Sequence, residues 1–239
     1  MSISIVIPAY LESENLKLLL PRLQTTLKAL NTPFEILVIA PMTEMDDTKS
    51  ICAKFERGGV KYIAREGGNN FGDAMRTGIK YAQNEYIVTM DADGSHKPED
   101  IKSMYESIKN ENFDIVIGSR YTKNGKTDNN FILRFMSYTV NVCYHLFFNL
   151  KVRDVSTSFR IYKADKLKSL VLLSKNFEIV EEIIILFKNK YKDARINEIP
   201  VHFKSRILGE SKRSLVKFAF TYIFSIVKLY KLKLKAKSK

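Results

Sequence analysis

The chain has 239 residues, and 45% of them are hydrophobic, which is enough to bury a substantial core and argues against bulk disorder. Lys and Arg total 39 against 26 Asp and Glu, a formal charge of +13 that favours anionic partners such as nucleotides, lipid phosphates or nucleic acid. Only Cys52 and Cys143 occur, which argues against a disulfide framework or a cysteine-rich metal site and favours a cytoplasmic location.

Short apolar runs alternate with segments of helical spacing through the first half of the chain. We expect strands at residues 3–7, 35–39, 60–64, 86–90 and 114–118. Between them we expect helices at residues 12–30, 43–57, 71–83 and 99–110. This alternation predicts an α/β fold with a mostly parallel central sheet covered by helices on both faces. Ligands of such sheets bind outside the carboxyl ends of the strands, so polar clusters that follow a strand are candidate sites.

The second half of the chain is richer in aromatic residues. We expect a helix at 131–150, a strand at 159–162, a helix at 177–190 and a strand at 195–203. The N-terminus lacks the basic and long apolar segments of a signal peptide. The apolar segment 215–230 carries Lys217 and Lys228, so it suits a helix lying in the membrane interface better than one that spans the bilayer. We therefore expect one domain over residues 1–212, followed by a basic amphipathic membrane-interface helix and tail over residues 213–239.

The sharpest local signal is a pair of carboxylates, Asp91 and Asp93, between an apolar strand and the turn at Gly94. This position puts two oxygen ligands at the carboxyl edge of the sheet. Mg²⁺ and Mn²⁺ prefer such ligands, and Mg²⁺ often takes one or two carboxylates together with substrate phosphates. A bound cation would neutralise charge on a departing diphosphate. Taken alone, the same residues also fit a polar turn that closes a strand.

Several short motifs along the chain carry a family resemblance. In order they are Val6-Ile7-Pro8-Ala9-Tyr10 with Glu12, Glu14 and Asn15; Asp91-Ala92-Asp93; Ile117-Gly118-Ser119-Arg120-Tyr121; Asp154-Val155-Ser156-Thr157-Ser158-Phe159-Arg160; and Gly209-Glu210-Ser211-Lys212. With this order and spacing, residues 2–212 resemble the family-two inverting glycosyltransferases of the GT-A fold. The likeness is greatest to the dolichyl- and polyprenyl-phosphate mannose and glucose synthases. It implies a Rossmann-like nucleotide-binding domain that uses Mg²⁺ or Mn²⁺ and a nucleotide-diphosphate sugar.

The resemblance also implies roles for single residues. Asp91 and Asp93 match the metal and diphosphate motif. The positions that match donor-binding residues are Pro8, Ala9, Tyr10, Glu12, Asp91, Arg206, Ser211 and Lys212. The last three match a flexible loop that closes over the donor, where closure would bring positive charge to the diphosphate and exclude water. The positions that match residues holding the acceptor phosphate are Arg120, Arg134 and Ser137.

Two departures from the family pattern concern the donor side. Family members usually carry paired Asp after the second strand, whereas residues 40–44 here read Ala-Pro-Met-Thr-Glu. Acidic residues return only at Asp46 and Asp47, within the predicted helix, which puts recognition of the base or ribose in doubt. The polyprenyl-phosphate synthases often add an amide side chain two residues after the second Asp. This chain has Ser95 and then His96, and either can complete the shell or leave it to water.

The nature of the acceptor can be argued physically. A hydroxyl acceptor generally needs a general base, whereas a phosphate monoester is already anionic at neutral pH and needs positioning. Arg120 and Arg134, beside the apolar helix expected at 131–150, suit a lipid phosphate. For a hydroxyl acceptor, the candidate bases are Asp154, Glu181 and Glu182, although the two glutamates equally fit a solvated helix face. Asp91, Asp93, Asp154 and Glu182 are therefore the candidate catalytic residues.

The sequence thus predicts an inverting transfer of a hexose from a GDP- or UDP-sugar to dolichyl or undecaprenyl phosphate at the cytoplasmic membrane face. The protein would associate peripherally with the membrane. One rival is transfer to a hydroxyl of a lipid-linked glycan in surface-polysaccharide assembly. Another is a non-catalytic partner of a transferase, suggested by the missing acidic pair. Nucleic acid is not an expected partner, because strand-end carboxylates would repel its phosphates without a metal.

Overall fold

The computed structural model describes residues 1–208, 226 and 230, and its centre is a seven-stranded sheet with the order β3-β2-β1-β4-β7-β5-β8. The strands of this sheet are β1 (Ile3–Pro8), β2 (Phe34–Ala40), β3 (Val60–Ala64), β4 (Tyr86–Thr89), β5 (Ile115–Ser119), β7 (Arg160–Lys163) and β8 (Ile196–Pro200). All neighbours pair in parallel except β7, which runs antiparallel to both β4 and β5. The α/β fold with a mostly parallel sheet is therefore confirmed.

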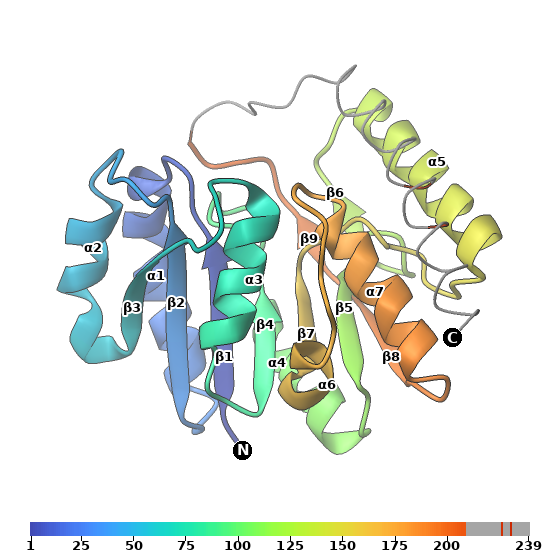
Figure 1. Ribbon diagram of the computed structural model, residues 1–239, viewed down its shortest axis with the longest axis horizontal. Coiled ribbons are helices and arrows are strands. Elements are labelled where there is room, and N and C mark those ends of the chain that lie inside the picture. The colour runs from blue at the N-terminus through green and yellow to red at the C-terminus, as the bar shows by residue number, and fades with distance from the viewer. Residues whose placement is uncertain (209–225, 227–229, 231–239) are drawn as a thin grey trace.

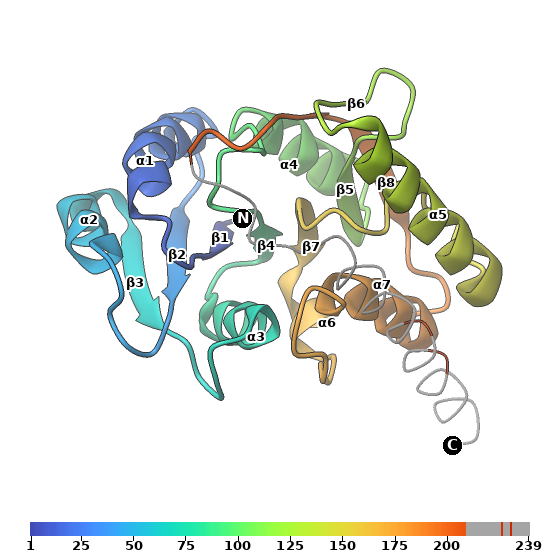
Figure 2. The same cartoon turned by 90° about the horizontal axis from the view of Figure 1, so that it is seen from above.

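Helices cover both faces of the sheet (Figures 1 and 2). The helices on one face are α1 (Ser13–Lys28), α2 (Thr48–Lys54) and α4 (Asp100–Asn110). Those on the other face are α3 (Phe71–Tyr81), α6 (Ala164–Lys168) and α7 (Ile179–Lys190). A 3₁₀ turn, η1, spans Glu56–Gly58. At Gly78, a Cβ would lie only 2.2 Å from a methyl group of Val6, so this glycine lets α3 approach β1 closely.

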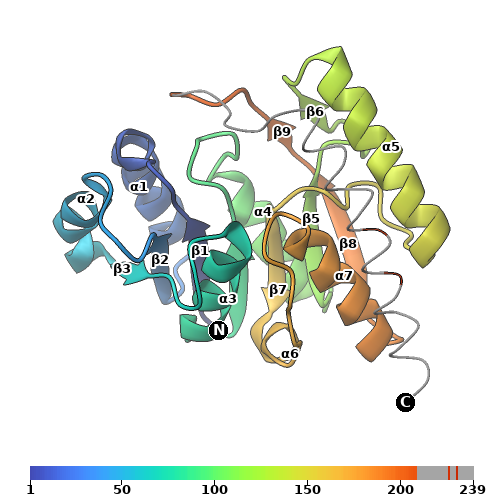
Figure 3. The same ribbon diagram turned by 45° about the horizontal axis from the view of Figure 1, so that its top comes forward.

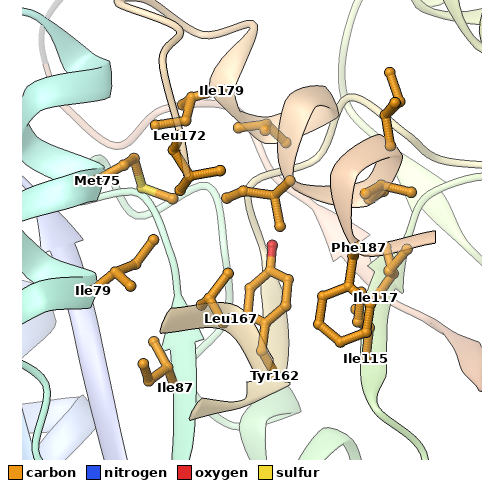
Figure 4. Close-up of a cluster of buried hydrophobic side chains, with 14 of the residues drawn as sticks. Met75, Ile79, Ile87, Ile115, Ile117, Tyr162, Leu167, Leu172, Ile179 and Phe187 are labelled. Carbon is orange, nitrogen blue, oxygen red and sulfur yellow. The ribbon is translucent and has the colours of Figure 1, made fainter. Parts of the chain in front are cut away.

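Two hydrophobic cores lie on opposite faces of the sheet because side chains alternate along each strand. Val6, Leu37 and Ile39 face the core beneath α3 and α7, whereas Ile5 and Val38 face the core beneath α1 and α4. In the first core, Ile87, Ile115 and Tyr162 from three strands meet side chains of the helices (Figure 4). Burial of these side chains fixes the register, because a slip of one residue would turn every apolar side chain to the wrong face.

The helix α5 (Phe131–Phe148) stands at the end of the molecule opposite α2 (Figures 1 and 3). A second, two-stranded sheet, β6 (Lys126–Thr127) with β9 (His202–Phe203), lies beside it. The α5 N-cap is Asn130, whose side chain accepts a hydrogen bond from the backbone N–H of Leu133. No helix within the described part of the chain is both long and apolar enough to cross a membrane.

The strands predicted for the first half of the chain are all present, with ends that differ by no more than one residue. Two other expectations were wrong in their bounds. The strand expected at 195–203 is divided, because the Val201 N–H bonds to the Ser119 carbonyl and the chain then passes from β8 into the small sheet. The helix expected at 43–57 is shorter, because it begins at Thr48 and ends at Lys54, and η1 follows it. Two short elements, α6 (Ala164–Lys168) and β6 (Lys126–Thr127), have no counterpart among the expected elements.

Asp46 and Asp47 therefore precede the helix in which we had placed them. Asp46 accepts hydrogen bonds from the backbone N–H groups of Ser13 (3.0 Å) and Thr48 (3.2 Å). These bonds satisfy one orphan donor at the start of α1 and hold the loop after β2 against it. Asp47 occupies the N-cap position of α2. A tertiary contact that local periodicity does not encode thus sets where this helix starts.

Candidate active site

The sheet has a topological switch point between β1 and β4, because the chain continues from β1 to β2 on one side and reaches β4 on the other. Crevices at such points, outside the carboxyl ends of the strands, are where open α/β sheets bind ligands. The segments that follow these two strands begin at Ala9 and Met90. They carry the first loop and the carboxylate pair predicted from the sequence.

Asp91 and Asp93 lie just beyond β4, in a turn made possible by Gly94, whose φ of 77° is in the left-handed region. Asp91 is supported from β7. Thr89 pairs with Arg160, so the antiparallel register brings Ser158 opposite Asp91, and the Ser158 hydroxyl donates to Asp91 Oδ1 at 2.9 Å. Because β7 is antiparallel to β4, the residues that precede β7, including Ser158, lie at the carboxyl end of β4. In a parallel strand, the preceding residues would lie at the opposite edge of the sheet.

Ser95 and His96 complete the turn. The Ser95 hydroxyl and backbone N–H both donate to Asp93 Oδ1, at 2.6 and 3.0 Å. His96 is buried and stacks on Phe159, with its Nδ1 accepting the N–H of Asp91 at 3.1 Å. Burial lowers the His96 pKa, although nearby carboxylates oppose this, so the ring is neutral at pH 7 and Nδ1 is free to accept. Both residues orient the aspartates.

The first loop continues β1 through Ala9 and Tyr10. The Ala9 N–H bonds to the Ile39 carbonyl at 2.9 Å, while the Tyr10 side chain is 41% exposed. Leu11 has a φ of 56°, a left-handed conformation that is strained for a residue of this type. This turn leads into α1 and leaves the Glu12 carboxylate close enough to Asp93 for the charge of Asp93 to act on it. Burial raises the pKa of Glu12, and Asp93 adds to that rise, whereas Asn15 and Arg206 oppose it.

Arg65 lies beneath this loop, and the sequence did not single it out. It is 5% exposed, donates to the carbonyls of Ala9 and Asn69, and lies 5.9 Å from the centre of the Tyr10 ring. Asn69 in turn accepts the N–H of Met42. Arg65 and Asn69 thus tie together the loops that follow β1, β2 and β3. These loops meet because β3, β2 and β1 are parallel neighbours in the sheet. No local sequence motif therefore predicts that Arg65 joins them.

Arg206 reaches the same crevice from the segment after β9. Its Nη2 pairs with Glu12 Oε1, and its Nε lies 3.4 Å from Asp93 Oδ2. Backbone bonds fix the segment: Lys204 N–H bonds to the Ser95 carbonyl and Ile207 N–H to the Asp93 carbonyl. Of the predicted donor residues, Glu12 and Arg206 lie beside Asp93, and Pro8, Ala9 and Tyr10 belong to β1 and the loop that leads to Glu12. Ser211 and Lys212 lie outside the described residues.

A second polar cluster, the Arg120 cluster, lies where β5 ends and consists of Arg120, Asp154, Ser137 and Ser156. Arg120 binds Asp154 through two nitrogens, Nε at 2.8 Å and Nη2 at 2.7 Å, and its Nη2 also contacts Ser156 at 2.8 Å and Ser137 at 3.3 Å. Burial alone would raise the Asp154 pKa, but the charge and hydrogen bonds of Arg120 outweigh burial and lower the pKa. The carboxyl is therefore ionised. The Arg134 side chain is exposed one turn before Ser137 on α5.

The other candidate bases, Glu181 and Glu182, are both buried. Glu182 is fully buried, and its two oxygens accept the backbone N–H groups of Leu173 and Ser174 at 3.0 and 2.9 Å. Glu181 is also buried, so neither glutamate lies on the solvated helix face that the sequence left open. Arg160, again not singled out from the sequence, is fully buried and donates to the Val155 and Val180 carbonyls. These bonds join α7 to the segment that carries Asp154.

The residues at the crevice fit a divalent cation. Asp91 and Asp93 offer carboxylate oxygens within one turn after β4, and the Arg206 guanidinium lies against Asp93. Across the described residues, no group of three or more His, Cys, Asp or Glu side chains forms a closed metal site. Such an open pair suits Mg²⁺ or Mn²⁺, which complete their shell with substrate phosphates and water. Asp91 and Asp93 are therefore the residues that would hold it.

The fold is a Rossmann-like α/β domain whose candidate site lies at the carboxyl edge of a mostly parallel sheet. A solved glucosyl-3-phosphoglycerate synthase from Mycobacterium tuberculosis, in complex with Mn²⁺, UDP and phosphoglyceric acid, superposes with a TM-score of 0.71. The match covers 96% of this chain and 78% of that one, at 15% identity, and so concerns the fold alone. The chain belongs to glycosyl transferase family 2, whose family model matches residues 4–171.

Two relatives refine this placement. A dolichol-phosphate mannosyltransferase from Pyrococcus furiosus is 33% identical over 97% of this chain, and the chain spans 64% of that protein's length. An undecaprenyl-phosphate mannosyltransferase from Micrococcus luteus is 29% identical, with 90% of this chain and 88% of that protein covered. The resemblance seen in the sequence motifs is therefore confirmed at the level of the family.

Proposed function

We propose that this chain transfers a hexose from a GDP- or UDP-sugar to a polyprenyl phosphate, with inversion and with Mg²⁺ or Mn²⁺. The observation that carries the proposal is the pairing of two different charged sites on one sheet edge. Asp91 and Asp93, with Arg206 against them, would form a site for a metal and a diphosphate. Arg120 and Ser137, with Arg134 one turn earlier on α5, would form a site for a second phosphate.

On the donor side, Asp91 and Asp93 would hold the metal, which supplies positive charge to the leaving diphosphate. The first loop, from Pro8 to Glu12, would line the nucleotide pocket. Arg206 would bind the diphosphate through charge-assisted hydrogen bonds, and Ser211 and Lys212 would join it. Ser158, Ser95 and His96 would orient the aspartates through the bonds described above.

On the acceptor side, the contacts of the carboxylates favour a phosphate over a hydroxyl. Asp154 is held by Arg120, and Glu182 by two backbone N–H groups, so use of either as a general base would break these bonds. A phosphate monoester needs no deprotonation, because it is anionic at neutral pH. Arg120 and Arg134 would position its oxygens for direct displacement at the anomeric carbon. The names of the two relatives favour a polyprenyl phosphate and mannose.

The helix α5 supports a lipid acceptor, because Ser137 on one side of it meets Arg120 while large apolar side chains are exposed elsewhere on it. The most exposed are Phe131 (79%), Leu146 (72%), Tyr138 (62%) and Phe135 (61%). A membrane surface would bury these side chains, and the positive charge of the chain would attract anionic lipids. We therefore propose peripheral association with the cytoplasmic membrane face. The segment 213–239 expected to add to it lies outside the described residues, apart from residues 226 and 230.

The test measures release of nucleotide from a panel of GDP- and UDP-hexoses by the purified protein in detergent. Mn²⁺ or Mg²⁺ is included or omitted, with and without a short polyprenyl phosphate. We expect release to need both the metal and the lipid phosphate, and to fall at least a hundredfold in Asp93→Asn. Asp193→Asn, which changes an exposed aspartate after α7, is the matched control. Release that needs metal but proceeds equally with a glycan acceptor and no lipid phosphate would overturn the acceptor assignment.

A further inference from the structure

Arg206 stands in the crevice as a cation between two carboxylates. Its guanidinium pairs with Glu12 through Nη2 and lies 3.4 Å from Asp93 through Nε. The side chains of Glu12 and Asp93 are 11% and 21% exposed, and that of Arg206 is 26% exposed. Two carboxylates this sheltered repel one another, and a positive charge between them relieves the repulsion. The Arg206 guanidinium, which contacts both carboxylates, supplies that charge.

A catch formed by Glu12 and Asn15, at the start of α1, holds Arg206 in this position. Asn15 Nδ2 donates to Glu12 Oε2 at 2.7 Å and to the Leu208 carbonyl at 3.3 Å. Glu12 thus holds the Arg206 side chain, and Asn15 holds the backbone at Leu208. From the other side, Ile207 N–H bonds to the Asp93 carbonyl at 3.1 Å, and the Ile207 side chain packs over Gly94. The segment from Arg206 to Leu208 is therefore anchored to both loops of the crevice by the protein's own hydrogen bonds.

This arrangement has a consequence for the metal proposed at Asp91 and Asp93. A divalent cation entering beside Asp93 would lie close to the guanidinium, and two like charges at such a distance disfavour each other. Arg206 would have to give up its contact with Asp93, and it would then need another anion. A diphosphate is such an anion, because a guanidinium binds its oxygens through paired, charge-assisted hydrogen bonds.

We propose that Arg206 substitutes for part of the metal's charge in the ligand-free protein, held in place by Glu12 and Asn15 as positioning residues. The divalent cation then binds weakly alone and tightly together with a nucleoside diphosphate, which draws Arg206 away from Asp93. The divalent cation and the nucleoside diphosphate bind together, and Arg206 then contacts the diphosphate in place of Asp93. This inference rests on the proposed metal role of Asp91 and Asp93.

The test titrates the full-length protein with Mn²⁺ and follows the electron paramagnetic resonance signal of free Mn²⁺, with and without GDP or UDP. We expect the wild-type protein to bind Mn²⁺ at least tenfold more weakly alone than with its preferred diphosphate. In Arg206→Gln the competing charge is gone, so we expect Mn²⁺ alone to bind about tenfold more tightly than in the wild type. The increase in Mn²⁺ affinity that GDP or UDP produces should therefore be smaller in Arg206→Gln than in the wild type.

Three further variants separate charge from damage to the fold. Arg206→Lys keeps the positive charge and should bind Mn²⁺ as the wild type does. Asn15→Ala leaves all charges in place but releases the catch, so Mn²⁺ alone should bind about threefold more tightly, in the same direction as Arg206→Gln. Arg57→Gln removes an exposed arginine from the far end of the sheet and should change nothing. Circular dichroism confirms that each variant is folded.

The outcomes distinguish this inference from the function on which it rests. If Mn²⁺ binds tightly only with the nucleotide in the wild type and in Arg206→Gln alike, the charge substitution by Arg206 is wrong and the metal site stands. Equal Mn²⁺ affinity of the wild type with and without nucleotide would overturn the inference as well. If no variant binds Mn²⁺ even with GDP or UDP, the proposed metal role of the aspartates fails, and this inference fails with it.

Discussion

Two arginines on the same sheet edge sit in very different surroundings. Arg120, where β5 ends, has a side chain only 8% exposed and binds the fully buried Asp154 through two nitrogens. Arg206, on the segment after β9, is 26% exposed and bridges residues of two separate loops. The first pair is fixed by strands and helices on several sides. The second depends on a few contacts that a ligand can replace. We therefore expect the Arg120–Asp154 pair to contribute to the stability of the fold and the contacts of Arg206 to change when a ligand binds.

The largest effect should come from breaking the fixed pair. In Asp154→Asn, the Arg120 guanidinium stays buried without a counter-charge, and we expect the free energy of unfolding to fall by about 3 kcal/mol. Urea unfolding followed by circular dichroism measures this loss. Asp128→Asn removes an exposed carboxylate that contacts His202, and it should lower the free energy of unfolding far less than Asp154→Asn. A loss for Asp154→Asn as small as that of the control would contradict the comparison.

The pH dependence of stability sharpens the same contrast. The pKa of Asp154 is lowered in the folded protein because Arg120 outweighs the effect of burial. A lowered folded-state pKa gives stability that is present above the unfolded value, about 3.9, and is lost as the pH falls through the folded value. The difference in unfolding free energy between the wild type and Asp154→Asn should therefore stay constant from pH 7 to about 5 and narrow only below about 4. Narrowing that begins near pH 6 would contradict a lowered pKa.

At the Asp91 and Asp93 site, we expect the hydrogen bonds that orient the carboxylates to affect metal binding. Ser158→Ala removes the hydrogen bond to Asp91 Oδ1. We expect the affinity for Mn²⁺ in the presence of GDP or UDP to fall about tenfold, because residues that orient ligands commonly have effects of this size. Calorimetric titration measures the affinity. Ser50→Ala, on α2, is the matched control and should leave it unchanged. An unchanged affinity in Ser158→Ala would show that Asp91 needs no support from β7.

A third region, the exposed side of α5, should affect membrane binding without affecting either arginine. Phe135 is 61% exposed, so Phe135→Ser costs little packing in the folded protein. We expect binding to vesicles of anionic lipid to weaken about tenfold, from the loss of one buried aromatic side chain at the membrane surface. Co-sedimentation with the vesicles measures this. Leu18→Ser, at 47% exposed on α1, should bind as the wild type does. Equal weakening by both changes would contradict a specific role of α5.

The smallest effect concerns the strained turn that leads into Glu12. Leu11 has a φ of 56°, and asparagine tolerates this region better than a bulky apolar residue. Leu11→Asn should therefore raise the free energy of unfolding by about 1 kcal/mol. The matched change Leu18→Asn lies inside α1, where asparagine is a poorer helix former, and it should lower stability by a few tenths of a kcal/mol. Destabilisation by both would mean that the strain at Leu11 is offset by contacts of its side chain.

The sequence alone determined the alternation of strands and helices, because buried parallel strands are continuous apolar runs and helices repeat every 3.6 residues. It also determined where the carboxylates Asp91 and Asp93 fall, because residues that follow a strand must lie at its carboxyl end. The family motifs added the expected roles of Arg120, Arg134 and Arg206. The ends of the first strands were predicted to within one residue on the same grounds.

Only the tertiary structure decided which groups meet. The antiparallel direction of β7 brings Ser158 to Asp91, and the order of β1, β2 and β3 brings Arg65 beneath Tyr10. Asp46 lies before its helix because Ser13, 33 residues away, donates to it. Glu182 and Asp154 are bound within the protein, although their sequence context equally suited catalysis. The physical reason is common to all of these: hydrogen bonds and ion pairs form between groups close in space, and local periodicity does not record distance across a sheet.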